Sequence, residues 1–193
     1  MSENNEQVEK LLGDFFERHT AGDREGMNQV LQKIQTMLYS GEVDSTPFKD
    51  YFNNMYTGRS AINVAGMVND YPRESIIREL LQNVFGCDYE ENDIKVMIEF
   101  LDEGQVKLTY NETGFSLEQV FYYLSVGRND GNKEREGRFG LGAKSVFANV
   151  DWFKMRSNNY SLRVVNDGGT LKVRELELTA PQFKHTEIVF ALD

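Results

Sequence analysis

The stretch GRFGLGAKSVF, residues 137–147, is the most specific part of the chain. Its glycines at 137, 140 and 142 precede a helical pattern, which predicts unobstructed backbone N–H groups at the start of a helix. Such an end binds phosphate through its free donors and through the helix dipole. A glycine pattern of this kind also fits a dinucleotide-binding loop, but that loop needs a surrounding βαβ unit. The residues that follow predict strands instead, so we expect a phosphate site in another fold.

Outward from this stretch, hydrophobic periodicity predicts helices first and a largely antiparallel sheet afterwards. The expected helices cover about residues 60–69, 73–86, 116–124 and 141–149. The expected strands cover 94–100, 105–110, 151–157, 160–166, 170–178 and 187–192. Turn residues separate the strands at 102–104, 158–159 and 167–169. This order predicts an α+β two-layer sandwich.

The first part of the chain predicts a helical hairpin over residues 5–40, with a break and a helix cap at Ala21-Gly22-Asp23. A second start signal, Ser45-Thr46-Pro47, precedes a short segment rich in aromatic residues. We therefore expect an N-terminal helical extension over residues 1–58, packed on a core domain over residues 59–193.

The composition narrows the class of protein. The 193 residues carry a formal net charge of −10, which disfavours nonspecific binding to nucleic acid. The single cysteine, Cys87, cannot form an internal disulfide, which fits a reducing compartment. The N-terminus lacks a signal-peptide pattern, and no apolar run approaches the roughly 18 residues needed to span a membrane. The expected location is the cytoplasm.

Glu79 and Asn83 lie four residues apart on the predicted 73–86 helix, at the margin of its apolar face. The carboxylate can orient and deprotonate a water, and the carboxamide oxygen is a hard ligand suited to Mg²⁺. The alternative is the ordinary solvated edge of an amphipathic helix.

The segment YNETGFS, residues 110–116, leaves a predicted strand and enters a predicted helix. Adenine recognition needs an acceptor for the exocyclic amine and a close approach of the backbone. Glu112 offers the acceptor, and Gly114 removes the side chain that would block the base. The alternative is a plain loop between strand and helix.

A polar, glycine-rich loop at residues 125–133 precedes the phosphate stretch, and its composition fits a lid that orders on ligand. Near the end of the chain, Thr186 opens the last predicted strand after His185. On its own, Thr186 is an ordinary β-branched strand residue whose hydroxyl can also bind a ligand. His19 and His185 are too few for a metal cluster.

Taken together in chain order, these motifs over about residues 60–192 resemble the ATP-binding domain of the gyrase, heat-shock chaperone, histidine kinase and MutL (GHKL) superfamily. Residues 71–83 are most similar to the sacsin-like, chaperone-like branch. The resemblance implies a Bergerat-type mixed sheet covered by helices, with an extra N-terminal helical hairpin. Three departures are Glu112 in place of Asp, Ser116 in place of the second glycine, and His185 in place of glycine.

The resemblance implies Mg²⁺-dependent binding and slow hydrolysis of ATP, coupled to a conformational change. Glu79 would be the general base and Asn83 the Mg²⁺ ligand. The implied nucleotide-binding residues are Asn83, Glu112, Gly114, Phe115, Gly137, Arg138, Phe139, Gly140, Leu141, Gly142, Lys144 and Thr186. Expected partners are ATP and ADP, together with a protein client or a further domain that supplies a basic residue to the phosphate. A homodimer is also compatible with the resemblance, whereas a membrane is not an expected partner.

Two other classes of function remain open from the sequence. One is an ATP-gated binding switch without useful turnover, which would bind ATP tightly and release little phosphate. The other is a degenerate GHKL interaction domain, which the substitutions at Glu112, Ser116 and His185 suggest. That class would show no nucleotide-dependent change in thermal stability.

Overall fold

A computed structural model describes residues 3–41, 43, 45–57, 75–87, 89, 93–116, 119–120, 149–168, 170–177 and 183–192. The phosphate stretch 137–147, the glycine-rich loop 125–133 and the predicted helix 60–69 lie outside these residues. The predicted domain boundary near residue 58 also lies at the start of an undescribed segment. None of the described helices is long and apolar enough to cross a membrane.

The described elements are helices followed by strands, so the α+β class is confirmed. The helices are α1 (Glu3–Ala21), α2 (Arg24–Tyr39), α3 (Thr46–Thr57) and α5 (Ile76–Phe85). The strands are β1 (Val96–Phe100), β2 (Gln105–Tyr110), β3 (Trp152–Asn158), β4 (Tyr160–Asp167), β5 (Thr170–Glu177) and β6 (Phe183–Ala191). They form a six-stranded sheet in the order β1-β2-β6-β3-β4-β5. Over these strands every pairing is antiparallel, as the hydrophobic periodicity predicted for most of the sheet.

The last strand begins earlier than its sequence predicts. β6 starts at Phe183, four residues before the expected start at Glu187. The reason is pairing with both neighbours, since Thr186 lies opposite Tyr110 of β2 and Phe183 lies opposite Asn158 of β3. The central position of β6 supplies ladder hydrogen bonds on both sides, and these extend a strand beyond its apolar core.

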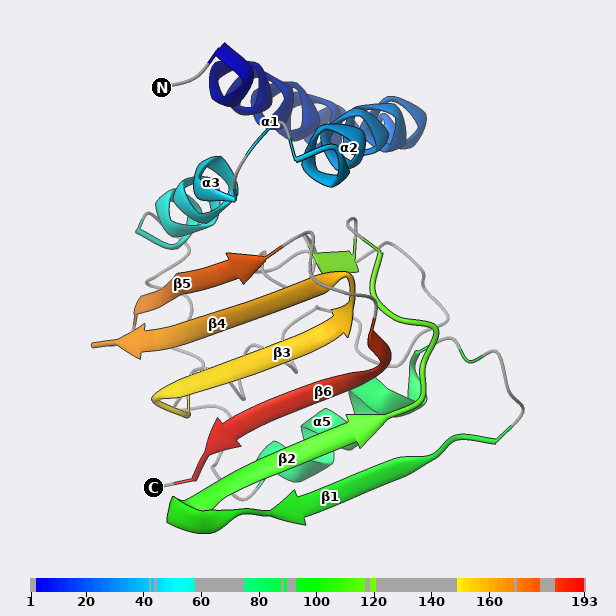
Figure 1. Ribbon diagram of the computed structural model, residues 1–193, viewed down its shortest axis with the longest axis vertical. Coiled ribbons are helices and arrows are strands. Elements are labelled where there is room, and N and C mark those ends of the chain that lie inside the picture. Colours follow the sequence, from blue (N-terminus) through cyan, green and yellow to red (C-terminus); the bar gives the residue numbers. More distant parts are fainter. Residues whose placement is uncertain are drawn as a thin grey trace.

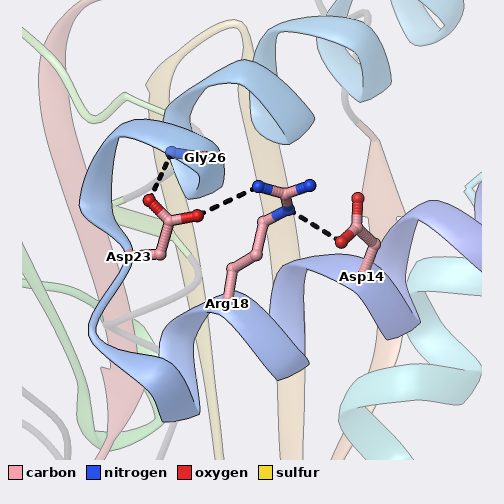
Figure 2. Close-up of polar contacts among 4 residues, drawn as sticks. All are labelled: Asp14, Arg18, Asp23 and Gly26. Carbon is pink, nitrogen blue, oxygen red and sulfur yellow. Dashed lines mark hydrogen bonds and ion pairs between the residues drawn. The ribbon is translucent and has the colours of Figure 1, made fainter.

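The predicted helical hairpin is confirmed as α1 and α2, and polar contacts hold the connection between them. Asp23 accepts a hydrogen bond from the Gly26 N–H at 3.0 Å and so caps the start of α2. Arg18 of α1 reaches both Asp14, at 2.7 Å, and Asp23, at 3.0 Å (Figure 2). The guanidinium therefore joins the last turns of α1 to the cap of α2.

Helix α3 lies along the β5 edge of the sheet (Figure 1). The Asn53 carboxamide pairs with the backbone of Val173 in both directions. It accepts from the Val173 N–H at 2.7 Å and donates to the Val173 carbonyl at 3.2 Å. These backbone groups point away from β4, so Asn53 takes the place that a further strand would occupy.

Helix α5 lies behind β2 and β6 in the view of Figure 1 and packs its apolar stripe on one face of the sheet. Ile76, Leu80 and Val84 are buried, as their helical spacing predicts. Side chains along β2 point alternately to the two faces of the sheet, and Val106, Leu108 and Tyr110 are buried on the face toward α5. Buried residues of β6 and β3 belong to the same core as the α5 stripe.

Candidate functional site

Glu79 and Asn83 both lie on α5, one turn apart, at the margin of its buried stripe as predicted. The Glu79 side chain keeps only 12% of its surface exposed, and its Oε1 lies 3.1 Å from Nη2 of Arg78. Arg78 is 70% exposed, so water screens this ion pair strongly. One carboxylate oxygen of Glu79 is thus engaged by a side chain that can move away.

The Asn83 carboxamide is the informative group on this helix. Its Nδ2 is buried and has no hydrogen-bond partner in the part of the chain that the structure describes. A buried amide donor without a partner costs about 1–3 kcal/mol, so native proteins keep few of them. A carboxamide with unused hydrogen-bonding capacity beside a near-buried carboxylate is expected where a polar ligand binds.

A cluster of buried polar side chains lies where β2, β3 and β6 end or begin at the same end of the sheet. Glu112 is 5% exposed, and Ser157 and Thr186 are both 0% exposed. Among the described residues these are the only buried polar or charged side chains, and they come from three separate segments. We call Glu112, Ser157 and Thr186 the polar cluster.

Ser157 is the centre of the polar cluster. Its Oγ accepts from the Phe115 N–H at 2.9 Å and lies 2.5 Å from the Thr186 Oγ1, either hydroxyl being able to donate. Ser157 therefore ties the segment after β2 to the start of β6. Because Ser157 accepts from Phe115, its proton is available to Thr186, and the Thr186 proton can then point to a ligand.

Gly114 allows this close approach. Its φ of +90° belongs to a region that suits glycine. A Cβ at this position would lie 2.9 Å from the Asn158 Cβ and 3.4 Å from its backbone nitrogen. Asn158 itself has a φ of +51° in the β3–β4 turn and donates to the Phe115 carbonyl at 3.4 Å. Residue 114 thus has no room for a side chain because Asn158 lies close, whereas the role predicted for Gly114 beside the base stays a prediction.

Tyr89 connects the polar cluster with α5. Its hydroxyl donates to the Val84 carbonyl in the last turn of α5 at 2.7 Å. Burial raises the pKa of the Tyr89 phenol, and the neighbouring Cys87 and Glu112 raise this pKa further. Tyr89 thus stays protonated and can donate to the helix carbonyl. Cys87 adds a contact from its Sγ to the Asn83 carbonyl at 3.2 Å.

The two other departures from the sequence motif have structural explanations. Ser116 begins a helix, since its Oγ accepts from the Gln119 N–H at 3.2 Å while its own N–H donates to Gln119 Oε1 at 2.8 Å. His185 is exposed and packs edge-on against Phe183, with ring centroids 6.2 Å apart. Since successive residues of a strand face opposite sides, His185 points away from the face that holds Thr186.

Six of the predicted site residues fall within the described chain. They are Glu79, Asn83, Glu112, Gly114, Phe115 and Thr186. Phe115 and Thr186 both bind Ser157, and Glu112 and Gly114 belong to the same segment as Phe115. Glu79 and Asn83 lie on α5, which contacts Tyr89. The remaining residues lie outside the described chain, namely Gly137, Arg138, Phe139, Gly140, Leu141, Gly142 and Lys144.

Ser157, Asn158 and Tyr89 were not among the residues predicted from the sequence. Ser157 shares its parity with Phe153 and Met155, which are buried, so the alternation of β3 already places it on the core face. That signal marks a polar residue in a core position. Its contact with Phe115, 42 residues away, depends on strand order and could not be read from β3 alone.

The described residues contain no group of three His, Cys, Asp or Glu side chains suited to holding a metal. Mg²⁺ does not require such a group, because it keeps several waters and is often held by one or two protein oxygens together with ligand phosphates. The carboxamide oxygen of Asn83 is a ligand of that kind, whereas its unpartnered Nδ2 is a donor and suits a ligand oxygen, not a metal. The residues are therefore compatible with a metal that arrives with a phosphorylated ligand.

Comparisons with known proteins give similarity at the level of structure. No protein-family model and no curated protein matches the chain. The ATPase region of Saccharomyces cerevisiae topoisomerase II is similar, with a TM-score of 0.49 and 14% identity over 61% of this chain and 37% of that one. The ATPase and transducer domains of Balamuthia mandrillaris DNA topoisomerase II match with a TM-score of 0.49 and 14% identity over 62% of this chain and 37% of that one. This chain thus spans 37% of each matched chain.

Proposed function

We propose that this chain is an ATP-binding domain of the GHKL type, with the adenine base held at the polar cluster. The observation that carries the proposal is the convergence of Glu112, Ser157 and Thr186, the buried polar side chains of the described chain, at one end of the sheet. A carboxylate accepts hydrogen bonds only, so it selects a ligand edge that presents a donor. The exocyclic amine of adenine is such a donor, whereas guanine presents a carbonyl at the same place.

Thr186 and Ser157 extend this recognition. With Ser157 donating to Thr186, the Thr186 hydroxyl is free to donate to a ring nitrogen, directly or through a water. Gly114, two residues after the carboxylate of Glu112, passes close to Asn158 and has no side chain that could enter the site. A donor and an acceptor at fixed positions in a buried site discriminate between bases, because the wrong base leaves one of them unpaired.

The proposal places the phosphates toward α5 and the glycine-rich stretch 137–147. Asn83 would hold Mg²⁺, which would neutralise phosphate charge and polarise the terminal phosphate. Glu79 would orient the attacking water and accept its proton. Gly137, Gly140 and Gly142 would give backbone donors to the phosphates, with Arg138 and Lys144 as basic partners. A chaperone-like role, in which slow turnover drives a conformational change, is the corresponding cellular function.

The Arg78–Glu79 ion pair favours a second candidate, an ATP-gated switch without useful turnover. A guanidinium 3.1 Å from the carboxylate competes with water for the oxygen that a general base needs. The two candidates predict the same binding and different release of phosphate. Release of labelled phosphate by the wild type at the level of Glu79→Ala would favour the switch.

Thermal stability with ATP, ADP and GTP, with and without Mg²⁺, tests the proposal. A nucleotide at a hundred times its Kd adds about 2.7 kcal/mol, which for a domain of this size raises Tm by roughly 5–10 °C. We expect this rise with ATP and ADP and a smaller one with GTP. Glu112→Ala should abolish the difference, while Glu175→Ala, a carboxylate 61% exposed on β5, should keep it. Equal shifts for ATP and GTP in the wild type would exclude Glu112 as the base-reading group.

A further inference from the structure

The two edges of the sheet differ in what lies beside them. At the β5 edge, Asn53 of α3 satisfies both backbone groups of Val173. At the other edge, β1 has no described neighbour beyond it (Figure 1). Phe100 is 78% exposed, Met97 is 51% exposed, and Ile94 is 42% exposed. An edge strand with exposed apolar side chains is a template for adding a further strand.

We propose that β1 pairs with β1 of a second copy of this chain, antiparallel and centred on Met97, so that two sheets join into one. Three features of β1 support this pairing, and none depends on nucleotide binding. They are the direction of its backbone groups, the order of the charges along it, and its exposed apolar side chains.

The backbone restricts which registers are possible. The Lys95 carbonyl accepts from the Asn111 N–H at 3.3 Å, and the Leu101 N–H donates to the Gln105 carbonyl at 2.8 Å. Odd-numbered residues therefore direct their N–H and C=O groups toward β2. Val96, Ile98 and Phe100 direct theirs outward, since the groups alternate along a strand. In a symmetric antiparallel pair of β1 strands, each even-numbered residue must lie opposite an even-numbered residue of the other copy, because only these have backbone groups free to pair outward. The two-fold axis therefore passes through one residue and not between two neighbouring residues.

Charge then selects one of the permitted centres. With the axis at Met97, Lys95 of each copy lies opposite Glu99 of the other, and two opposite-charge pairs form. With the axis at Ile98, Lys95 meets Leu101 and Glu99 meets Met97. With the axis at Val96, Glu99 meets Asp93, and the two carboxylates repel. Of these three registers, only the one centred on Met97 places opposite charges across from each other.

Glu99 is already placed for this pairing. It lies opposite Lys107 of β2, with the Lys107 Nζ 2.5 Å from the Glu99 Oε2. Interaction with the Glu99 carboxylate raises the pKa of Lys107, so the lysine stays charged. Lys95 of the second copy would approach Glu99 from the opposite side, giving a ladder in which the carboxylate lies between two cations.

The apolar side chains match on the opposite face. Val96, Ile98 and Phe100 share a face with the buried β2 residues Tyr110, Leu108 and Val106, with which they are in register. In the Met97 register, Val96 faces Ile98 and Ile94 faces Phe100 of the second copy. The pairing thus removes from water the side chains that the single chain leaves exposed, which is the expected driving force of association.

Disulfide trapping tests the register. Met97→Cys, in a Cys87→Ser background, places two thiols opposite each other at the two-fold axis, where strand geometry brings the Cα atoms to about 4.5 Å, within the range of a disulfide. We expect a covalent dimer under mild oxidation. Lys154→Cys, exposed on the same face but in the middle of the sheet, is the matched control and should stay monomeric. Absence of the Met97→Cys dimer would overturn the proposed register.

Sedimentation equilibrium of charge variants tests the pairing without a covalent bond. Lys95→Glu alone and Glu99→Lys alone each place like charges opposite one another twice per dimer and should weaken association by about tenfold. An equal mixture of these two variants restores both complementary pairs and should associate as well as the wild type. Ile98→Pro removes an outward N–H while leaving the β2 ladder intact, so it should fold as a monomer. A monomeric wild type at about 100 μM, or a mixture no tighter than its components, would refute the proposal.

Discussion

Gly114→Ala is the substitution whose cost follows most directly from the structure. At φ +90° an alanine carries backbone strain of about 1–2 kcal/mol. Its Cβ would also lie 2.9 Å from the Asn158 Cβ, where carbon atoms normally keep about 3.5–4.0 Å. Overpacking of this kind costs about 1–3 kcal/mol. Asn158 cannot retreat freely, because it forms the β3–β4 turn at φ +51° and binds the Phe115 carbonyl. We therefore expect a loss of about 3 kcal/mol in the free energy of unfolding.

The matched control is Gly168→Ala in the β4–β5 turn. Gly168 has a φ of +60°, but a Cβ there meets nothing within 4 Å, so only the backbone strain of about 1 kcal/mol applies. At roughly 3 °C per kcal/mol, thermal unfolding should give a Tm about 9 °C lower for Gly114→Ala and about 3 °C lower for Gly168→Ala. Gly114→Ala should also lose stabilisation by ATP, while Gly168→Ala should keep it. Equal Tm losses in the two variants would refute the assigned contact with Asn158.

Three further outcomes follow from the same contacts. Ser157→Ala removes the hydroxyl that accepts from the buried Phe115 N–H and should lower the free energy of unfolding by about 1–3 kcal/mol in chemical denaturation. Ser157→Thr keeps a hydroxyl, so any loss of stability in this variant should come only from the added methyl group. Asn83→Ala should weaken ATP binding in calorimetry only when Mg²⁺ is present, and an effect of equal size without Mg²⁺ would exclude Asn83 as a metal ligand. Glu79→Ala should bind ATP normally and release phosphate about a hundredfold more slowly. Asp23→Ala should lower stability by about 1 kcal/mol through loss of the α2 cap, and an unchanged unfolding midpoint would contradict that assignment.

The sequence predicted helix starts and turns well where a single residue or a short motif determines them. Asp23 marks the start of α2 because its short carboxylate reaches the Gly26 N–H, and this contact needs no distant partner. The hairpin of β1 and β2 follows likewise from the turn at Asp102–Gly104, where Glu103 and Gly104 both have positive φ. Such features are encoded within four or five residues and are visible before any fold is known.

Features that depend on pairing between distant segments could not be predicted in the same way. The early start of β6 at Phe183 is imposed by β3, and the protection of the β5 edge depends on Asn53, which lies 120 residues from Val173. The candidate site shows both cases. Glu112 and Thr186 were predicted from local motifs, whereas Ser157, which connects their segments, becomes visible only once β3 is paired with β6.

The most direct test of the central claim is a map of nucleotide binding by two-dimensional ¹H–¹⁵N NMR during titration with ADP. If adenine occupies the polar cluster, the amides of Glu112, Phe115, Ser157 and Thr186 should shift together and follow a single saturation curve. The amide of Gly168, in the β4–β5 turn, is the internal control and should stay fixed. A titration that shifts other amides while Phe115, Ser157 and Thr186 remain unchanged would contradict an adenine site at this end of the sheet.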